Sequence, residues 1–342
     1  MFFCEIFVNF ATMKRFCLVI SLLFVLALCS LFVGAVEISF ADVWNVLTGR
    51  ATSDEARTIV IGIRMPQMLT ALFCGAGTAV SGLLLQTAFR NPLAGPGVFG
   101  IGSGASLAVA LLMLLPTSAM AGGWLSCSVL LAAFVGAMAV TMLVLFLSRF
   151  MKDDAILLIA GLMVGYLASS LITLLNFWAT AEGVRRFTLW GMGDFSNVSL
   201  QRFPLFALLI TIGLLASCLL VKPMNVMQLG DRYAESLGFS ARTQRRCMLL
   251  VSGWLTAVGT AYCGPIAFLG MAVPHLARFV LQTENHRTLL PMTMLIGAVV
   301  ALVCQIICQI SFAHGTIPLN AVTPFFGAPI VLFYLLKKGR NW

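Results

Sequence analysis

The sequence predicts an all-α integral membrane protein that forms one transmembrane domain of about ten helices over residues 1–342. Hydrophobic residues make up 60% of the chain and charged residues only 10%, whereas soluble domains are about 45–50% apolar and about 25% charged. The apolar runs are long and continuous, and a helical span needs roughly 20 such residues. Strands of a membrane barrel would instead alternate apolar and polar positions, so these runs indicate a helical bundle.

Nine apolar runs divide the chain, and one of them is long enough for two spans. The runs lie at about 16–36, 65–89, 97–115, 124–148, 155–178, 204–221, 247–281, 289–313 and 319–336. Gly264-Pro265 and then Pro274 interrupt the seventh run, so we expect two spans there and ten in all. An even number places both termini on one side of the membrane.

Charge predicts which side that is. Lys14-Arg15 precede the first run, which is longer than the 7–15-residue core of a typical signal peptide. We therefore expect a retained first span. With the termini in the cytoplasm, most of the 21 Lys and Arg residues fall on that side, as the positive-inside rule requires. This basicity fits topology and anionic lipid, and it indicates no nucleic-acid partner.

This chain lacks the residues that several classes of function require. No Asp, Glu, Lys or Arg lies in the middle of a predicted span, although ion-coupled carriers usually place ionisable groups there. The chain also has no GxxxxGK[ST], HExxH or GxSxG motif. We therefore expect a protein that is not an enzyme, binds no cofactor or metal itself and is driven by a partner. An ion-coupled secondary carrier or a channel is the alternative.

The segment 222–246 is unusually polar for this chain, and within it "LGDRYAESLGFSARTQRR" (229–246) is the most charged part. We expect Asp231 to cap a short helix that runs to Leu237 and stops at Gly238. Ser240 would cap a second short helix, "ARTQRR". From spacing alone, a docking surface and a solvated loop both remain open.

Other polar or broken stretches carry further expectations. Gly and Pro between residues 90 and 106 predict broken backbone that protein must bury at membrane depth. His275 is expected to be a hydrogen-bonding structural residue and His286 to be solvated. His314 and Asn176 are candidate substrate contacts. "GTAVSG" (77–82) echoes "GTAYCG" (259–264), a hint of the duplicated halves common in transporters.

Several ordered motifs resemble the iron-siderophore, haem and cobalamin permeases of bacterial ABC importers. They are "IRMPQMLTALFCGAGTAVSGLLLQTAFRNPLAGPGVFGIGSGAS" (63–106), "LLIAGL" (157–162), "KPMNVMQLGDRYAESLGF" (222–239), "GPIAFLGMAVPHLARF" (264–279), "NHRTLLP" (285–291) and "IPLNAVTPFFGAPIVLFYLLKKGR" (317–340). The resemblance implies a homodimer in the bacterial inner membrane, with ten spans per subunit. It also implies two cytoplasmic subunits that use ATP and Mg, and an external substrate-binding protein. The cargo would be a ferric siderophore or haem, with cobalamin as the alternative.

The resemblance also implies roles for individual residues. Residues 222–246 would form the coupling helices that seat in the ATP-binding subunits, through Asp231, Arg232, Tyr233, Glu235, Leu237, Gly238 and Phe239. A cytoplasmic gate would comprise Asn91, Leu93, Asp154 and Ala155, although the acidic residue departs from the family pattern.

Docking of the binding protein would use Arg64, with Gln67 and Gln309 in place of two family arginines. Arg185 and Arg186 are expected to compensate for that exchange. The departures predict docking that depends less on charge than in the family or that uses other positions.

Overall fold

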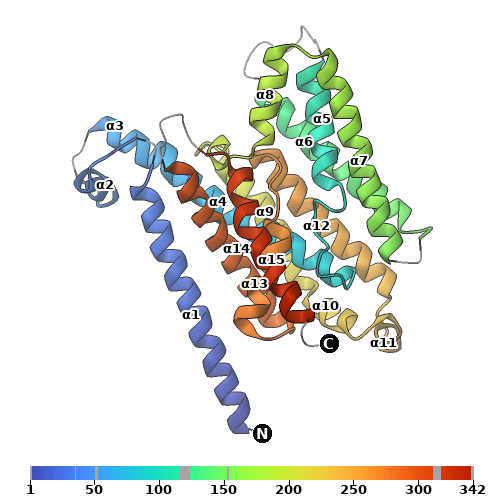
Figure 1. Ribbon diagram of the computed structural model, residues 1–342. Helices are drawn as coiled ribbons and strands as arrows, with labels where there is room; N and C mark the ends of the chain where they lie inside the picture. The colour runs from blue at the N-terminus through green and yellow to red at the C-terminus, as the bar shows by residue number, and fades with distance from the viewer. Residues whose placement is uncertain are drawn as a thin grey trace.

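The computed structural model describes residues 2–34, 36–50, 53–115, 124–151, 154–310 and 317–339. Within these residues every regular element is a helix (Figure 1). The fold class predicted from the apolar runs is therefore confirmed.

Each predicted span corresponds to a helix. The ten are α1 (Phe2–Phe32), α4 (Met65–Ala88), α5 (Ile101–Leu114), α6 (Trp124–Leu147), α7 (Asp154–Trp178), α9 (Phe203–Leu219), α12 (Ala241–Cys263), α13 (Leu269–Leu281), α14 (His286–Gln309) and α15 (Leu319–Gly339). Among the described residues, five helices are long and apolar enough to cross a membrane alone: α1, α4 with the helix preceding it, α6, α7 and α14. α9 and α10 (Val221–Gln228) together pass the same test as a pair bent by 50°. α5, α13 and α15 are apolar but shorter, and α12 is not among the helices that pass this test.

Shorter helices lie at the two ends of the bundle. They are α2 (Phe40–Leu47), α3 (Asp54–Arg57), α8 (Ala181–Gly191), α11 (Asp231–Ser236) and the 3-10 turn Phe195–Asn197. A π-helical segment (Thr58–Arg64) joins α3 to α4, so one helix runs from Asp54 to Ala88. The apolar pattern predicts only the part after Arg64, because charged residues precede it.

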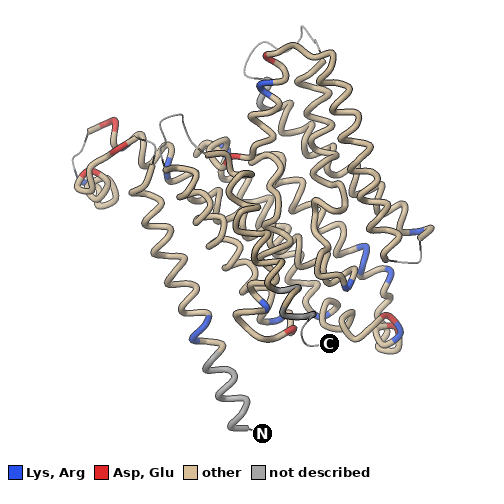
Figure 2. Tube along the Cα trace, viewed as in Figure 1, with Lys and Arg blue, Asp and Glu red and all other residues tan. Residues whose placement is uncertain are grey.

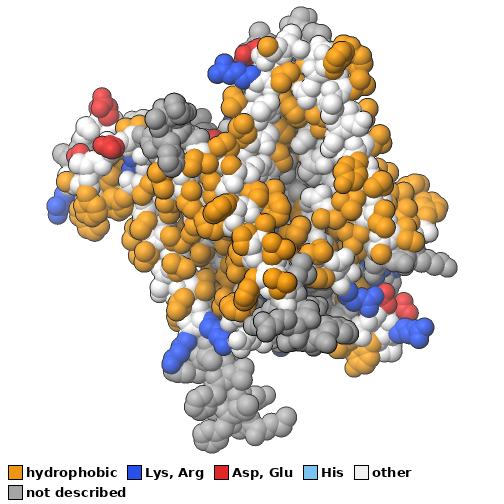
Figure 3. Space-filling model, viewed as in Figure 1, with side chains coloured by type: hydrophobic (Ala, Val, Ile, Leu, Met, Phe, Trp, Pro, Cys, Tyr) orange, Lys and Arg blue, Asp and Glu red, His pale blue; other side chains and the backbone are white. Residues whose placement is uncertain are grey.

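Charge divides the bundle into two ends. The start of α1, the end of α15, α10 and α11 lie at one end, which we name the α11 end, and α2, α3 and α8 lie at the other, the α8 end (Figure 1). Figure 2 shows charged residues at both ends and almost none between them. In the space-filling view, apolar side chains cover the middle of the visible face (Figure 3). This belt has the composition of a surface that faces lipid.

Small residues set how closely the central helices approach. A Cβ on Gly75 of α4 would collide with the backbone carbonyl of Gly297 on α14, and one on Gly82 would overlap the backbone of Gly270 on α13. Close backbone approach through small residues is the usual means of packing membrane helices. α4 therefore forms the centre of the bundle, and its two ends position the sites described below.

The predicted break after α4 is confirmed. Residues 90–100 form turns rather than helix, and Ala94 and Phe99 within them are fully buried. The segment 247–281 also divides as expected, because α12 ends at Cys263 and α13 begins at Leu269. Pro274, expected to break the chain a second time, instead lies inside α13. α4 and α12 pack against each other, but the duplication of the two halves stays a prediction.

Candidate functional site

The α11 end brings α11 against the end of α4. Asp231 is the first residue of α11 rather than its cap, since Gly230 precedes the helix with no side-chain cap. The carboxylate of Asp231 instead meets two guanidinium groups: Arg90 Nη2 lies 3.1 Å from Oδ1, and Arg245 Nη2 lies 3.2 Å from Oδ2. The expected cap is therefore wrong, because these arginines bind the side chain that would have capped the helix.

α11 ends as the sequence predicts. The N–H of Gly238 bonds to the carbonyl of Glu235, and the N–H of Phe239 bonds to that of Ala234. Gly238 has a φ of +82°, a left-handed conformation that glycine adopts without a Cβ penalty. Ser240 then accepts a hydrogen bond from the N–H of Thr243 and caps the next helix.

That next helix corrects a second expectation. "ARTQRR" is not a separate short helix but the first turns of α12, which continues unbroken to Cys263. α12 contains no Pro, so nothing interrupts the helical hydrogen bonds between its basic first turns and the apolar residues that follow. The basic residues thus sit on a rigid extension of a span.

The outward face of α11 is apolar. Tyr233 and Leu237 are each 51% exposed, and they follow one another at i and i+4 on one helix face. Ala234, on the opposite side, is fully buried. An open groove beside this face is lined by Arg90, Leu229, Gly230, Asp231, Arg232, Tyr233 and Ser236. Exposed apolar side chains beside a charged groove are typical of a protein docking surface.

The end of α4 has an unusual residue. Arg90 has a φ of +46°, and it takes the position where helices commonly place glycine. Its N–H bonds to the carbonyl of Thr87, and the N–H of Asn91 bonds to that of Gln86. A non-glycine residue in this left-handed region costs about 1–2 kcal/mol. Such an observed outlier is a reason to look for a role of the side chain.

Two side-chain hydrogen bonds hold the loop after Arg90. The Oδ1 of Asn91 accepts a hydrogen bond of 2.9 Å from the N–H of Leu93. The Nε2 of His275, on α13, lies 2.8 Å from the carbonyl oxygen of Pro92, and it donates, since a carbonyl oxygen only accepts. His275 is almost fully buried, so its predicted structural role is confirmed. Leu93 itself is 41% exposed.

The second predicted gate element begins α7. Asp154 is the first residue of that helix and Ala155 is exposed. The side chain of Asp154, and all of Asp153, lie outside the described residues, so an acidic gate stays a prediction.

His286 is placed differently from expectation. It is fully buried rather than solvated. Its Nε2 lies 2.9 Å from Thr87 Oγ1 on α4, and its Nδ1 lies 2.9 Å from Asn225 Oδ1 on α10. The sequence places His286 in a turn, but these partners come from helices that only the tertiary fold brings together.

At the α8 end, Arg64 departs from the predicted docking role. It is only 2% exposed. Its guanidinium donates to the carbonyl oxygens of Leu31 at 2.8 Å, Phe32 at 3.1 Å and Val36 at 2.6 Å. The carbonyls at a helix C-terminus lack intrahelical partners, so Arg64 satisfies the end of α1. We therefore remove it from the surface that we assign to docking.

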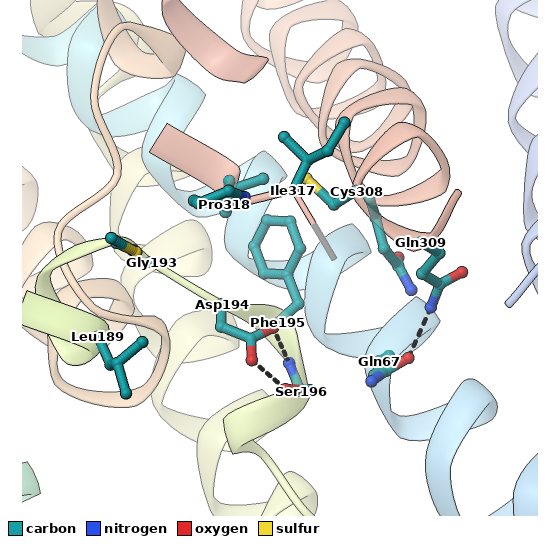
Figure 4. A pocket seen from close by; sticks show the side chains of 13 residues that line it. Gln67, Leu189, Gly193, Asp194, Phe195, Ser196, Cys308, Gln309, Ile317 and Pro318 are labelled. Atoms are coloured by element: carbon teal, nitrogen blue, oxygen red, sulfur yellow. Dashed lines mark hydrogen bonds between the residues drawn. The ribbon is translucent and has the colours of Figure 1, made fainter. Parts of the chain in front are cut away.

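Gln67 and Gln309 lie in a cavity of about 230 Å³ at the same end. Figure 4 shows the two amides turned toward each other across α4 and α14, where Gln309 Nε2 donates to Gln67 Oε1 at 2.6 Å. Gln305 also lines the cavity, and neither atom of its buried amide has a hydrogen-bond partner among the described residues. Asp194 binds the N–H and hydroxyl of Ser196 on the cavity wall. The described lining of this cavity therefore consists of uncharged polar and apolar groups apart from Asp194.

α8 presents the two predicted arginines at this end. Arg185 is exposed, and no described group pairs with it. Arg186 Nε lies 2.8 Å from Glu182 on the same helix. The charge of Arg185 is thus available to a partner protein, whereas Glu182 balances the charge of Arg186.

The two candidate substrate contacts have different outcomes. His314 lies outside the described residues. Asn176 is half-buried near the end of α7, and no described group hydrogen-bonds to its Oδ1. Among the described residues, no three His, Cys, Asp or Glu side chains gather as a metal site.

Comparison with known proteins decides the family. The model of the FecCD transport family matches residues 22–338, which is nearly the whole chain. The chain belongs to the FecCD transport family. It is 34% identical to the vitamin B12 import system permease protein BtuC of Salmonella arizonae, over 95% of both chains. It is also 34% identical to the hemin transport system permease protein HmuU of Yersinia pestis, over 93% of both chains.

A solved structure supports the same family. The FecCD chain superposes with a TM-score of 0.81 on an inward-facing metal-chelate type ABC transporter, at 28% identity. The match covers 93% of this chain and 97% of that one.

Sequence reasoning missed part of the site in this FecCD protein. The charge pattern gives Arg90 and Arg245 no partner, yet both bind Asp231. One signal was available for Arg90: it follows a predicted helix at the position where glycine is usual, directly before Asn91-Pro92. Nothing in the sequence pairs Arg245 with α4.

Proposed function

We propose that this FecCD protein is the transmembrane permease subunit of an ATP-driven importer of a metal chelate. The observation that carries the proposal is the α11 end. It combines an exposed apolar face at Tyr233 and Leu237 with a charged groove, and it joins the end of the central helix α4. A permease without its own nucleotide site needs such a surface to receive force from a partner.

In this proposal the α11 end faces the cytoplasm, and both termini lie there. The clustering of basic residues at that end supports the orientation. Two copies of an ATP-binding subunit, which use ATP and Mg, would seat on Tyr233, Leu237 and the neighbouring groove of two permease chains. Their closure would tilt the spans as rigid bodies.

The α8 end would then face an extracytoplasmic binding protein. Arg185 and the cavity lined by Gln67 and Gln309 support this assignment. The exchange of charged for amide side chains supports docking that depends less on ionic strength, since salt screens charged pairs but not neutral hydrogen bonds.

The cargo that we favour is an iron chelate, either a ferric siderophore or haem, with cobalamin as the alternative. The names of the relatives, which cover hemin and vitamin B12, support this class of large chelates. A homodimer that encloses the pathway is part of the proposal. α7, with many exposed apolar side chains, offers a face for that contact or for lipid.

A reconstituted complex tests the function. The permease is co-expressed with the ATP-binding subunit encoded beside it and placed in nanodiscs with the neighbouring binding protein. ATP hydrolysis is then measured with the binding protein empty or loaded with hemin, ferrichrome or cyanocobalamin. Stimulation by one loaded form supports the importer and identifies its cargo. Failure of the ATP-binding subunit to co-purify, with solute uptake by this chain alone along an ion gradient, would replace the proposal by a secondary carrier.

A further inference from the structure

We propose that Arg90 is a positioning residue that transmits movement of α11 to the gate loop, which we define as residues 91–93. The inference rests on the proposed function, because it assumes that a docked ATP-binding subunit moves α11. It goes beyond that function in assigning the transmission to one ion pair, Arg90 with Asp231.

The backbone at Arg90 is the first support. Arg90 adopts a φ of +46° at the end of α4. Its N–H and that of Asn91 close the helix on the carbonyls of Thr87 and Gln86. Glycine would make the same two bonds without a Cβ penalty. Helix termination alone therefore does not call for arginine, and the side chain needs a separate reason.

The contact with α11 supplies that reason. Arg90 Nη2 lies 3.1 Å from Asp231 Oδ1. The other carboxylate oxygen binds Arg245, whose Nε donates to the carbonyl of Ala88 at 3.0 Å. The carboxylate on α11 is thus connected to the last turn of α4 from two sides. A displacement of α11 must shift Arg90 or break these contacts.

The pair also lies where a partner reaches it. The side chains of Arg90 and Asp231 are 41% and 36% exposed, and both line the groove beside Tyr233. A subunit that docks on Tyr233 therefore covers the pair and lowers its exposure to water, which strengthens a charged contact.

The gate loop has a fixed point on its other side. His275 of α13 donates to the carbonyl of Pro92, two residues after Arg90. The loop therefore bridges α11, through Arg90, and α13, through His275. Relative movement of α11 and α13 must be absorbed by dihedral changes in these few residues, as in a hinge. Leu93, 41% exposed and thus largely free of core packing, would move with them.

The test follows gate movement directly and does not require the cargo. Leu93→Cys is introduced into the permease, and the complex with its ATP-binding subunit is placed in nanodiscs. The rate of labelling by a membrane-impermeant maleimide is measured before and after the complex is trapped with ATP and vanadate. The same complex without Leu93→Cys gives the background from native cysteines. The variants are Arg90→Gly, Arg90→Lys and Asp231→Asn, and Arg287→Gln is the control. Arg287 is an exposed cation at the same end, and no described group binds its side chain.

We expect trapping to change the labelling rate by about fivefold or more in the parent and in the control, the scale of a typical coupling between sites. In Arg90→Gly complexes that retain the ATP-binding subunit, the change should fall below about twofold, and the thermal midpoint should be equal or higher, since glycine relieves the strain at this position. Arg90→Lys should restore part of the response, because lysine keeps the positive charge but lacks the planar guanidinium group. Asp231→Asn should match Arg90→Gly, and it provides the test independently if the glycine variant misfolds.

Two results would overturn the inference. One is a full response in both Arg90→Gly and Asp231→Asn, which would leave Arg90 as a helix terminator only. The other is a parent whose labelling ignores trapping. A parent that fails to retain the ATP-binding subunit at all would instead refute the proposed function.

Discussion

Replacement of Arg64 separates a structural role from a docking role. Its guanidinium makes three hydrogen bonds to carbonyl oxygens near the end of α1, at 2.6–3.1 Å, from a site that is 2% exposed. Arg64→Leu leaves these acceptors without their donor. Each charged hydrogen bond contributes about 1.5 kcal/mol at the lower end of its range. Three such bonds amount to about 4.5 kcal/mol, from which water that reaches the carbonyls recovers a part.

We therefore expect a loss of about 3–4 kcal/mol in the free energy of unfolding. At about 2 °C per kcal/mol for a chain of this size, the thermal midpoint should fall by about 6–8 °C. The measurement is thermal unfolding of the purified permease in nanodiscs, followed by tryptophan fluorescence. Arg64→Lys should lose less, because an ammonium retains the charge and donates to fewer of the three carbonyls.

Arg57→Leu is the matched control. Arg57 lies two turns earlier on the same helix and is exposed, and no described group binds its side chain. Its replacement should change the midpoint by no more than about 1 °C. An unchanged midpoint in Arg64→Leu, together with weaker binding of the substrate-binding protein, would contradict the structural role of Arg64. That result would return Arg64 to the docking surface.

Three other predictions follow from the same contacts. Gly82→Ala should prevent stable assembly of α4 on α13, because the added Cβ overlaps the Gly270 carbonyl. Gly191→Ala should be tolerated, because a Cβ at Gly191 would meet no atom within 4 Å. The recovery of monodisperse protein is compared between the two variants, and equal recovery would contradict the close packing of α4 on α13. Tyr233→Ala with Leu237→Ala should lower retention of the ATP-binding subunit at least about tenfold, as measured by co-purification at fixed expression. Leu219→Ala is the control, because the Leu219 side chain is 82% exposed on α9 and its loss should not lower retention. Undiminished retention in the double variant would place the docking surface elsewhere. Gln67→Leu with Gln309→Leu should weaken binding of the substrate-binding protein by a factor of about five, and this factor should be the same at low and high salt. An effect that vanishes at high salt would show that charged groups govern binding at the α8 end.

The helical class, and a helix for each expected span, could be predicted from the sequence because a membrane span needs an apolar composition over consecutive residues. A run of about 20 apolar residues has few stable structures other than a membrane-spanning helix. Capping and stop signals at Ser240 and Gly238 were also predictable, because the hydrogen bonds that they make lie within a few residues. Asp231 failed as a cap for the opposite reason: its carboxylate had stronger partners 14 and 141 residues away in the chain, at Arg245 and Arg90.

The sequence by itself thus determined that this is a helical membrane protein and which family it belongs to. Only the tertiary structure decided what individual polar residues do. It buried Arg64 at the end of α1, enclosed His286 between α4 and α10, and joined Arg90 to Asp231. The physical reason is that burial of an apolar side chain depends on the run around it. A polar side chain instead takes its role from the specific donor or acceptor that folding brings within about 3 Å.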